Sequence, residues 1–203
     1  MPIRAVTNAL LCDGTTAPPR PGYTVVWEGS GITWVGPDSE ADLDGTEAFD
    51  AAGGAVVPGL IDAHVHLCME PTIDGTDAVA TDPIEVVRDR SMAAAGSLLR
   101  AGITSARDQG SRDGVAIEVA RAQREGRIIG ARIMAAGRGI TPTGGHGWMI
   151  GVEADGPEAV RQAVATEIER GAEIIKLFPT GGVLGTGAHG YALVMSGEEV
   201  AAA

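Results

Sequence analysis

The pattern of apolar and polar positions changes character near residue 57. Before that point the apolar residues fall in short runs rich in β-branched and aromatic side chains, and Gly- and Pro-rich turns separate the runs. Such runs are typical of strands in an all-β domain. We therefore predict that residues 1–57 form part of a small β-sandwich, with strands at residues 3–11, 23–28 and 32–35.

Residues 58–203 alternate between short apolar runs and segments whose apolar positions recur at helical spacing. Val160, Val164 and Ile168, for example, fall on one face of a helix that would begin at Pro157. The alternation predicts an α/β fold with parallel strands joined by helices. Strands are expected at 60–64, 103–106, 132–136 and 173–178, and helices at 83–100, 113–125, 157–170 and from Ser196 onward.

Four strand–helix units fit either a small open sheet or the first half of a TIM-type (β/α)8 barrel. A complete barrel needs about 250 residues, more than the chain provides after residue 57. Two histidines at the end of the first of these strands favour the barrel, because barrel active sites lie at the carboxyl ends of the strands. The predicted fold is therefore part of a β-sandwich over residues 1–57 and the truncated first half of a barrel over residues 58–203.

Composition narrows the expected partners and location. Hydrophobic residues make up 44% of the chain and aromatic residues 3%, so aliphatic side chains and alanine must fill the core. A formal net charge of −12 argues against binding to nucleic acid or to an anionic membrane. The two cysteines are too few for a disulfide framework, and no apolar run is long enough for a membrane span. A cytoplasmic protein is expected.

Two histidines, His64 and His66, end the apolar run that follows Pro58-Gly59. Residues i and i+2 of a strand face the same side, so the two imidazoles should converge and could bind a divalent metal. Histidine pairs of this kind also occur without a metal. By the same alternation Asp62 would share their face and could orient an imidazole. Cys68 is expected to be a small buried residue rather than a third ligand.

Lys176 lies near the end of a predicted strand, where an unpaired buried charge would be costly. Its stem could pack while its ammonium group reaches solvent, or it could form a salt bridge. His146 lies in a Gly-Gly-His loop after the third strand of the alternating part, where glycines allow close approach to a ligand. Taken by composition alone, such a loop histidine is usually just exposed. Asp108 is expected to pair with Arg107 or to cap the next loop.

The Gly-rich loop after residue 178 carries His189 and Tyr191, and Tyr191 is a candidate substrate-binding residue; a simple surface loop is an equal alternative. Residues 185–190 match the G-x-G-x-x-G pattern of dinucleotide-binding folds. That motif requires a strand directly before it and a helix directly after it. Neither is predicted here, so nucleotide binding is not expected.

Residues 58–66 resemble the first barrel strand of the amidohydrolase superfamily, whose motif is Pro-Gly, two hydrophobic residues, and Asp-x-His-x-His. Three segments are similar to the imidazolonepropionase-like and prolidase-like branch of that superfamily. They are the lysine strand 175–178, the residues 180–183 after it, and the Gly-Gly-His loop. The resemblance extends over nearly the whole chain. It implies that the chain is the N-terminal half of such an enzyme.

The resemblance also implies a site. His64, His66 and Lys176 would be ligands of two divalent metal ions, commonly zinc, with Lys176 carried as a carbamate made from carbon dioxide. His146 would be a catalytic and substrate-binding residue that polarises the oxyanion, and Tyr191 would bind substrate. The ligand histidines of barrel strands five and six and the aspartate base of strand eight have no counterpart in the chain.

The implied function is that of a metal-dependent amidohydrolase in which two metals activate water to cleave an amide bond. The substrate would be a small molecule, either a dipeptide or an N-acyl amino acid. Two alternatives stay open: a ring-opening hydrolase of the imidazolone type, and a catalytically incomplete fragment. Open barrel edges also predict a homo-oligomer or association with the missing half.

Overall fold

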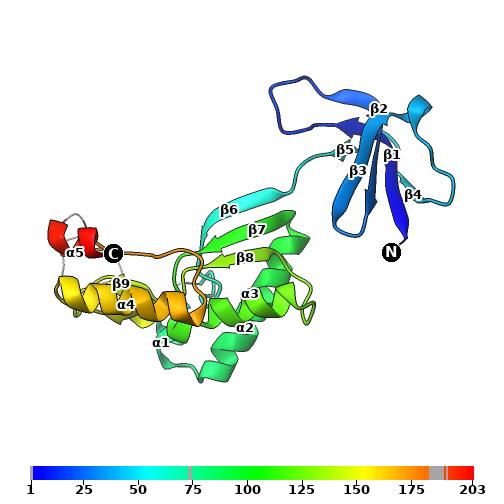
Figure 1. Ribbon diagram of the computed structural model, residues 1–203. Coiled ribbons are helices and arrows are strands. Elements are labelled where there is room, and N and C mark those ends of the chain that lie inside the picture. Colours follow the sequence, from blue (N-terminus) through cyan, green and yellow to red (C-terminus); the bar gives the residue numbers. More distant parts are fainter. Residues whose placement is uncertain (1, 73–74, 183–189, 191) are drawn as a thin grey trace. The chain divides into compact units, whose positions relative to one another are not determined.

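The computed structural model describes residues 2–72, 75–182, 190 and 192–203. The chain forms two compact units, Met1–Pro58 and Gly59–Ala203. Strands make up the sheet of the first unit, and the second combines parallel strands with helices, as expected for an α/β protein (Figure 1). Among the described residues, no helix is long and apolar enough to cross a membrane.

The first unit is a mixed sheet with strand order β3-β2-β1-β4, in which β5 also pairs with β1. The three predicted strands are present, but β2 begins earlier than expected, inside the Pro-rich stretch. The β1–β2 register slips between the pairs Ala9–Tyr23 and Leu11–Arg20, and a proline is tolerated at such an irregularity. The strands are β1 (Ile3–Leu11), β2 (Arg20–Glu28), β3 (Gly31–Pro37), β4 (Glu47–Asp50) and β5 (Ala55–Val56), with the 3-10 turn η1 (Asp38–Glu40).

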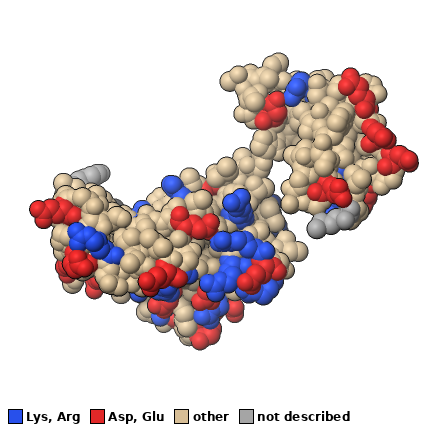
Figure 2. Space-filling view, viewed as in Figure 1, with Lys and Arg blue, Asp and Glu red and all other residues tan. Residues whose placement is uncertain are grey.

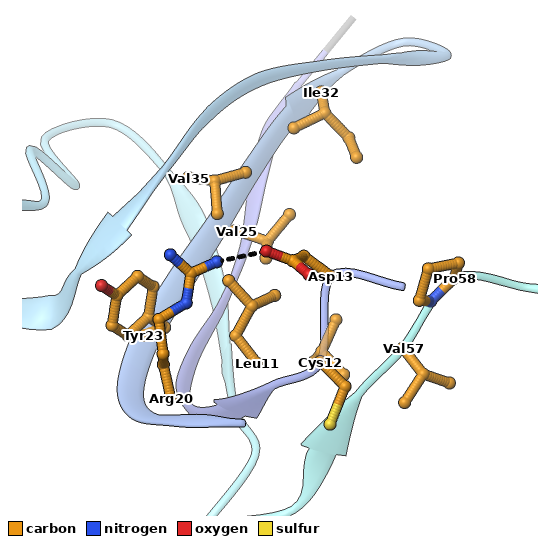
Figure 3. A pocket seen from close by; sticks show the side chains of 11 residues that line it. Leu11, Cys12, Asp13, Arg20, Tyr23, Val25, Ile32, Val35, Val57 and Pro58 are labelled. Carbon is orange, nitrogen blue, oxygen red and sulfur yellow. Dashed lines mark hydrogen bonds and ion pairs between the residues drawn. The ribbon is translucent and has the colours of Figure 1, made fainter. Parts of the chain in front are cut away.

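One side of this sheet is hollowed and apolar (Figure 3). The hollow has a volume of about 510 Å³. Its lining is mainly aliphatic, and the ion pair between Arg20 and Asp13, 2.7 Å long, lies among the lining residues. Ile32 and Val57 line it and remain largely exposed. The described part of the first unit therefore leaves an apolar surface uncovered.

The second unit is built around a parallel sheet with order β6-β7-β8. Helices α2 and α3 pack on one face of it, where Ala95, Ala120 and Ile133 are fully or almost fully buried (Figure 1). The predicted helices are found, together with α1 and the short strands β9 and β10, which were not predicted. The elements are β6 (Leu60–Val65), α1 (Gly75–Thr81), α2 (Ile84–Arg100), β7 (Ile103–Asp108), η2 (Arg112–Gly114), α3 (Val115–Arg124), β8 (Arg132–Ala135), β9 (Gly139–Thr141), η3 (Trp148–Ile150), β10 (Gly151–Glu153), α4 (Pro157–Arg170) and α5 (Gly197–Ala202).

Residues 173–178, predicted as a fourth strand, do not form a regular strand. They nevertheless run beside β8 and β9. The Glu173 amide donates to the Ala135 carbonyl at 2.9 Å, and Ile140 exchanges backbone hydrogen bonds with Lys176 (2.8 Å) and Phe178 (2.9 Å). Leu177 and Ile140 form an isolated parallel bridge. In the described part of the chain, only this one bridge links the segment to β9, so the pairing does not extend into a ladder.

Charged side chains of the second unit are largely intermingled (Figure 2). Basic side chains gather on one side of this unit in the view shown, with acidic ones among them. Several of these basic side chains form ion pairs with acidic ones. The pairs are Arg88–Glu118, Arg124–Glu173 and Arg127–Glu125, at 2.6, 2.6 and 2.7 Å. These partly exposed pairs contribute little to stability.

Candidate metal centre

His64 and His66 lie at the carboxyl end of β6, with ring centroids 5.3 Å apart and ring planes at 71°. The strand is irregular just before them. Asp62 pairs with Ala106 and Val65 with Asp108, so β6 carries one extra residue over this interval. Strict alternation is therefore interrupted between Asp62 and Val65, and the role of Asp62 in orienting an imidazole stays a prediction. Asp62 Oδ1 accepts the backbone N–H of His64 at 3.1 Å.

The orientation of the His66 ring is fixed by one hydrogen bond. Its Nδ1 lies 2.8 Å from the carbonyl oxygen of Gly110, which can only accept, so Nδ1 carries the proton. Nε2 is then left as the unprotonated nitrogen that a metal requires. Burial lowers the pKa of His66, although the bond to Gly110 opposes this. The ring is therefore held in the neutral form.

Lys176 reaches the same region from the segment beside β9. Its Nζ lies 4.9 Å from the centroid of the Phe178 ring. Burial, and after it the charge of Arg107, lowers the pKa of Lys176. Of the two alternatives left by the sequence, the salt bridge is not found, because Lys176 forms no ion pair with any residue in the described ranges.

His146 lies in the loop between β9 and η3 and faces Phe178, with ring centroids 5.3 Å apart and planes at 83°. The backbone at Gly182 packs so closely on the His146 ring that a Cβ there would lie 2.2 Å from Nδ1. Burial and the charge of Lys176 both lower the pKa of His146. The same lysine charge lowers the pKa of His64 and His66, where burial is the larger cause. The structure thus brings all four side chains into one electrostatic neighbourhood.

Other candidates fall outside this group. Tyr191 and His189 lie outside the described residues. Cys68 is fully buried among apolar side chains, and burial raises the pKa of its thiol to about 12, so it is not a thiolate ligand. Within the described ranges, no three His, Cys, Asp or Glu side chains form a group that could hold a metal. The candidate donors in the described residues are therefore the two histidines and the lysine predicted from the sequence.

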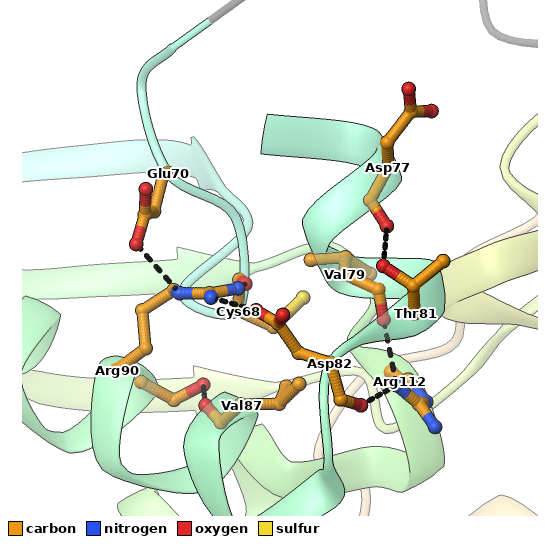
Figure 4. Close-up of polar contacts among 10 residues, drawn as sticks. Cys68, Glu70, Asp77, Val79, Thr81, Asp82, Val87, Arg90 and Arg112 are labelled. Carbon is orange, nitrogen blue, oxygen red and sulfur yellow. Dashed lines mark hydrogen bonds and ion pairs between the residues drawn. The ribbon is translucent and has the colours of Figure 1, made fainter. Parts of the chain in front are cut away.

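Arg90 of α2 binds the segment that follows His66 (Figure 4). Arg90 donates to the Cys68 carbonyl at 3.2 Å and pairs with Glu70 and Asp82. Arg112 then ties the end of α1 by donating to the carbonyls of Val79 and Asp82, at 2.9 and 2.6 Å. These contacts hold the backbone directly after the two histidines.

Phe178 supports the site and was not identified from the sequence. Its ring contacts both His146 and Lys176 and packs against two glycines, because a Cβ at Gly139 would lie 2.2 Å and one at Gly147 2.9 Å from ring carbons. The sequence did contain a signal for Phe178. It is an aromatic residue two positions after the lysine, in a chain with only two phenylalanines.

We expect Gly139→Ala to disturb the site through Phe178. The new methyl group cannot fit unless the ring moves, so the free energy of unfolding should fall by about 1–3 kcal/mol. Gly197→Ala is the matched control, because a Cβ there meets nothing within 4 Å. Urea unfolding of both variants measures the difference. Equal stability of the two would contradict the packing described for Phe178.

The chain is similar to several known proteins. The model of the amidohydrolase family matches residues 55–203. The ochratoxinase of Aspergillus niger is 32% identical over 156 residues, which cover 64% of this chain and 32% of that protein. The imidazolonepropionase of Anaeromyxobacter sp. (strain K) is 45% identical over 51 residues, 23% of this chain and 12% of that protein.

Among solved structures, a prolidase complexed with N-methylphosphonate-L-proline superposes with a TM-score of 0.89 at 30% identity. The match covers 98% of this chain and 52% of the prolidase, so the chain spans about half the length of that structure. The family match includes both histidines, the Gly-Gly-His loop and the lysine. The chain belongs to the amidohydrolase family.

Proposed function

We propose that this chain supplies the first ligands of a divalent metal centre in a hydrolase that cleaves an amide bond. The observation that carries the proposal is that His64 and His66 converge at the carboxyl end of β6 and that the charge of Lys176, from the segment beside β9, acts on both rings. The substrate class we propose is a dipeptide or an N-acyl amino acid. The names of two similar proteins, the prolidase and the ochratoxinase, support hydrolysis of amides.

The proposed architecture is part of a β-sandwich over residues 1–57 and the first half of a (β/α)8 barrel over residues 58–203. Parallel strands β6, β7 and β8, followed by residues 173–178 beside β9, support four consecutive barrel positions. Ile61 and Met134 line a hollow on the sheet and are 75% and 41% exposed, as expected for a barrel interior that is still open. The uncovered apolar hollow of the first unit supports an incomplete sandwich.

The donor chemistry fits a divalent ion. Both histidines are kept neutral, and the tautomer of His66 leaves Nε2 available. Imidazole nitrogens suit zinc, although they also suit several other ions. Two ions are proposed, with zinc as the leading choice. A divalent ion bound here would lower the pKa of a water molecule and polarise the scissile carbonyl.

Lys176 fits the set as a carbamate rather than as an ammonium ion. Its lowered pKa increases the fraction of neutral amine, which is the form that attacks carbon dioxide. The Nζ lone pair forms the N–C bond, one C=O π bond becomes a carboxylate oxygen, and the nitrogen releases a proton to water. The resulting carbamate is negatively charged and can attract a metal ion, whereas the ammonium form of Lys176 would repel it.

His146 is proposed to bind the substrate and to stabilise negative charge on the carbonyl oxygen. It lies on a loop, contacts the ring of Phe178, and is close enough to Lys176 for that charge to lower its pKa. That position suits contact with a substrate beside the metal ligands. Tyr191 is kept as a second proposed substrate-binding residue, outside the described structure.

The test is metal-dependent hydrolysis. Protein expressed from the whole reading frame around these 203 residues should cleave Xaa-Pro dipeptides or N-acyl amino acids. Chelation should reduce the rate at least about 100-fold, and Zn²⁺ with bicarbonate should restore it. The control is the isolated 203-residue chain, assayed in parallel. Hydrolysis that survives complete removal of metal would refute the proposal.

A second candidate is ring opening of an imidazolone, supported by the 45% identity to an imidazolonepropionase over 51 residues. The same assays distinguish it, since turnover of an imidazolone without turnover of linear amides would favour ring opening. A protein that binds metal but cleaves neither class would instead support the incomplete fragment. Size-exclusion chromatography tests the further proposal that the open sheet self-associates or pairs with the missing half.

A further inference from the structure

Asp108 is a fully buried carboxylate directly behind the two strand histidines. It ends β7, next to the end of β6 in the sheet. The carboxylate accepts two backbone N–H groups, Leu67 N at 2.8 Å on Oδ2 and Gly110 N at 3.0 Å on Oδ1. It does not pair with Arg107, which donates to the Ala63 carbonyl instead. The alternative that it caps the next loop is the one found.

Both residues that Asp108 holds are connected to His66. Leu67 follows His66 in the chain, and the carbonyl of Gly110 accepts from His66 Nδ1. Covalent and hydrogen bonds therefore form a closed loop that includes the His66 imidazole and runs through Gly110, Asp108 and Leu67. The backbone N–H of Gln109 also donates to the Val65 carbonyl at 2.9 Å, so the ends of β6 and β7 are joined at successive positions.

We propose that Asp108 is a positioning residue that sets the tautomer and orientation of His66. By holding the Gly110 amide, it aims the Gly110 carbonyl at Nδ1. By holding the Leu67 amide, it fixes the backbone from which the ring projects. His66 then keeps its proton on Nδ1 and presents Nε2. The link to metal binding rests on the proposed function, whereas the tautomer does not.

Asp108→Asn keeps the size of the side chain but replaces one acceptor oxygen with an NH2 group. That group faces a backbone N–H, so one of the two bonds must be lost. In the metal-free protein with ¹⁵N-labelled histidine, long-range ¹H–¹⁵N spectra report which ring nitrogen is protonated. We expect the wild-type His66 to be the pure Nδ1–H form and the variant to be a mixture. The His66→Gln spectrum identifies the signal.

Zn²⁺ affinity, measured by competition with a chromophoric chelator, should fall about 10–100-fold in Asp108→Asn. Glu167→Gln is the matched control. It also changes a fully buried carboxylate, but one on α4 that binds Arg138 rather than the strand ends. Its melting temperature should fall, while the His66 tautomer and the Zn²⁺ affinity stay as in the wild type.

The outcomes separate the two proposals. A wild-type His66 protonated on Nε2 would overturn the role of Asp108, whether or not the variant folds. An Asp108→Asn protein with unchanged tautomer and affinity would overturn it as well. If the tautomer changes as expected but the wild-type protein binds no Zn²⁺, the positioning role is supported and the metal centre fails.

Discussion

Lys176→Ala should lose metal and lose at least about 1000-fold in hydrolytic rate. Removing the side chain takes away the proposed carbamate, which leaves His64 and His66 as the proposed donors from the described part of this chain. A large effect is expected because a water molecule that is no longer bound to a metal ion regains its high pKa and is no longer activated. Metal content by elemental analysis and initial rates on one amide substrate measure the result, in protein from the whole reading frame.

A matched series distinguishes the carbamate from a simple cation. Lys176→Arg keeps a positive charge but cannot form a carbamate, so it should be as inactive as Lys176→Ala. Acetate or propionate added to Lys176→Ala should restore part of the rate by supplying a carboxylate to the vacated space. An active Lys176→Arg protein would exclude the carbamate and would favour a cationic role beside Phe178.

Glu167→Ala should destabilise the second unit by about 3–5 kcal/mol, because it leaves buried polar groups without their partner. Glu167 of α4 is fully buried and binds the strand connection between β8 and β9. Its carboxylate accepts the Arg138 backbone N–H at 3.0 Å and Nε at 2.7 Å, and Arg170 lies 3.6 Å away. Denaturant unfolding gives the change in free energy.

Glu158→Ala on the same helix is the control. Glu158 is 90% exposed and pairs with Arg161 at 2.8 Å, so its loss should change the free energy of unfolding by less than about 0.5 kcal/mol. Similar values for the two variants would mean that the buried carboxylate does not hold the connection. Loss of metal binding in Glu167→Ala without loss of stability would be equally inconsistent with this account.

Periodicity predicted the long elements well, because their signals are local. Pro157 begins α4, and Ser196 caps α5 by accepting from the Glu199 amide. The short strands β4, β9 and β10 were not predicted, since pairing with distant residues rather than their own sequence makes them strands. Residues 173–178 were wrongly predicted as a strand because an apolar run also needs continuous pairing, and this segment forms only one isolated bridge with β9.

The candidate site was predictable to the extent that motifs identify donors. The motifs singled out His64, His66, His146 and Lys176, and the structure brings these four side chains together. Phe178, Gly110 and the full role of Asp108 were missed. Each acts through a contact with a residue far away in the sequence, which spacing along the chain does not reveal. For Asp62, the extra residue in β6 interrupts the alternation on which its predicted face was based.

Few backbone hydrogen bonds hold the segment that carries Lys176, so we expect the two histidines to reach their positions before the lysine does. The histidine strand pairs with β7 at positions from Leu60 to Val65, whereas the lysine segment meets β9 through two hydrogen bonds of Ile140. Opening those two bonds, together with the packing of Phe178, would loosen the lysine segment and leave the histidines in place. A ligand that contacts all three side chains raises the free energy of that opening. Amide hydrogen exchange at Phe178 should then slow on loading, while exchange at Leu67 changes little.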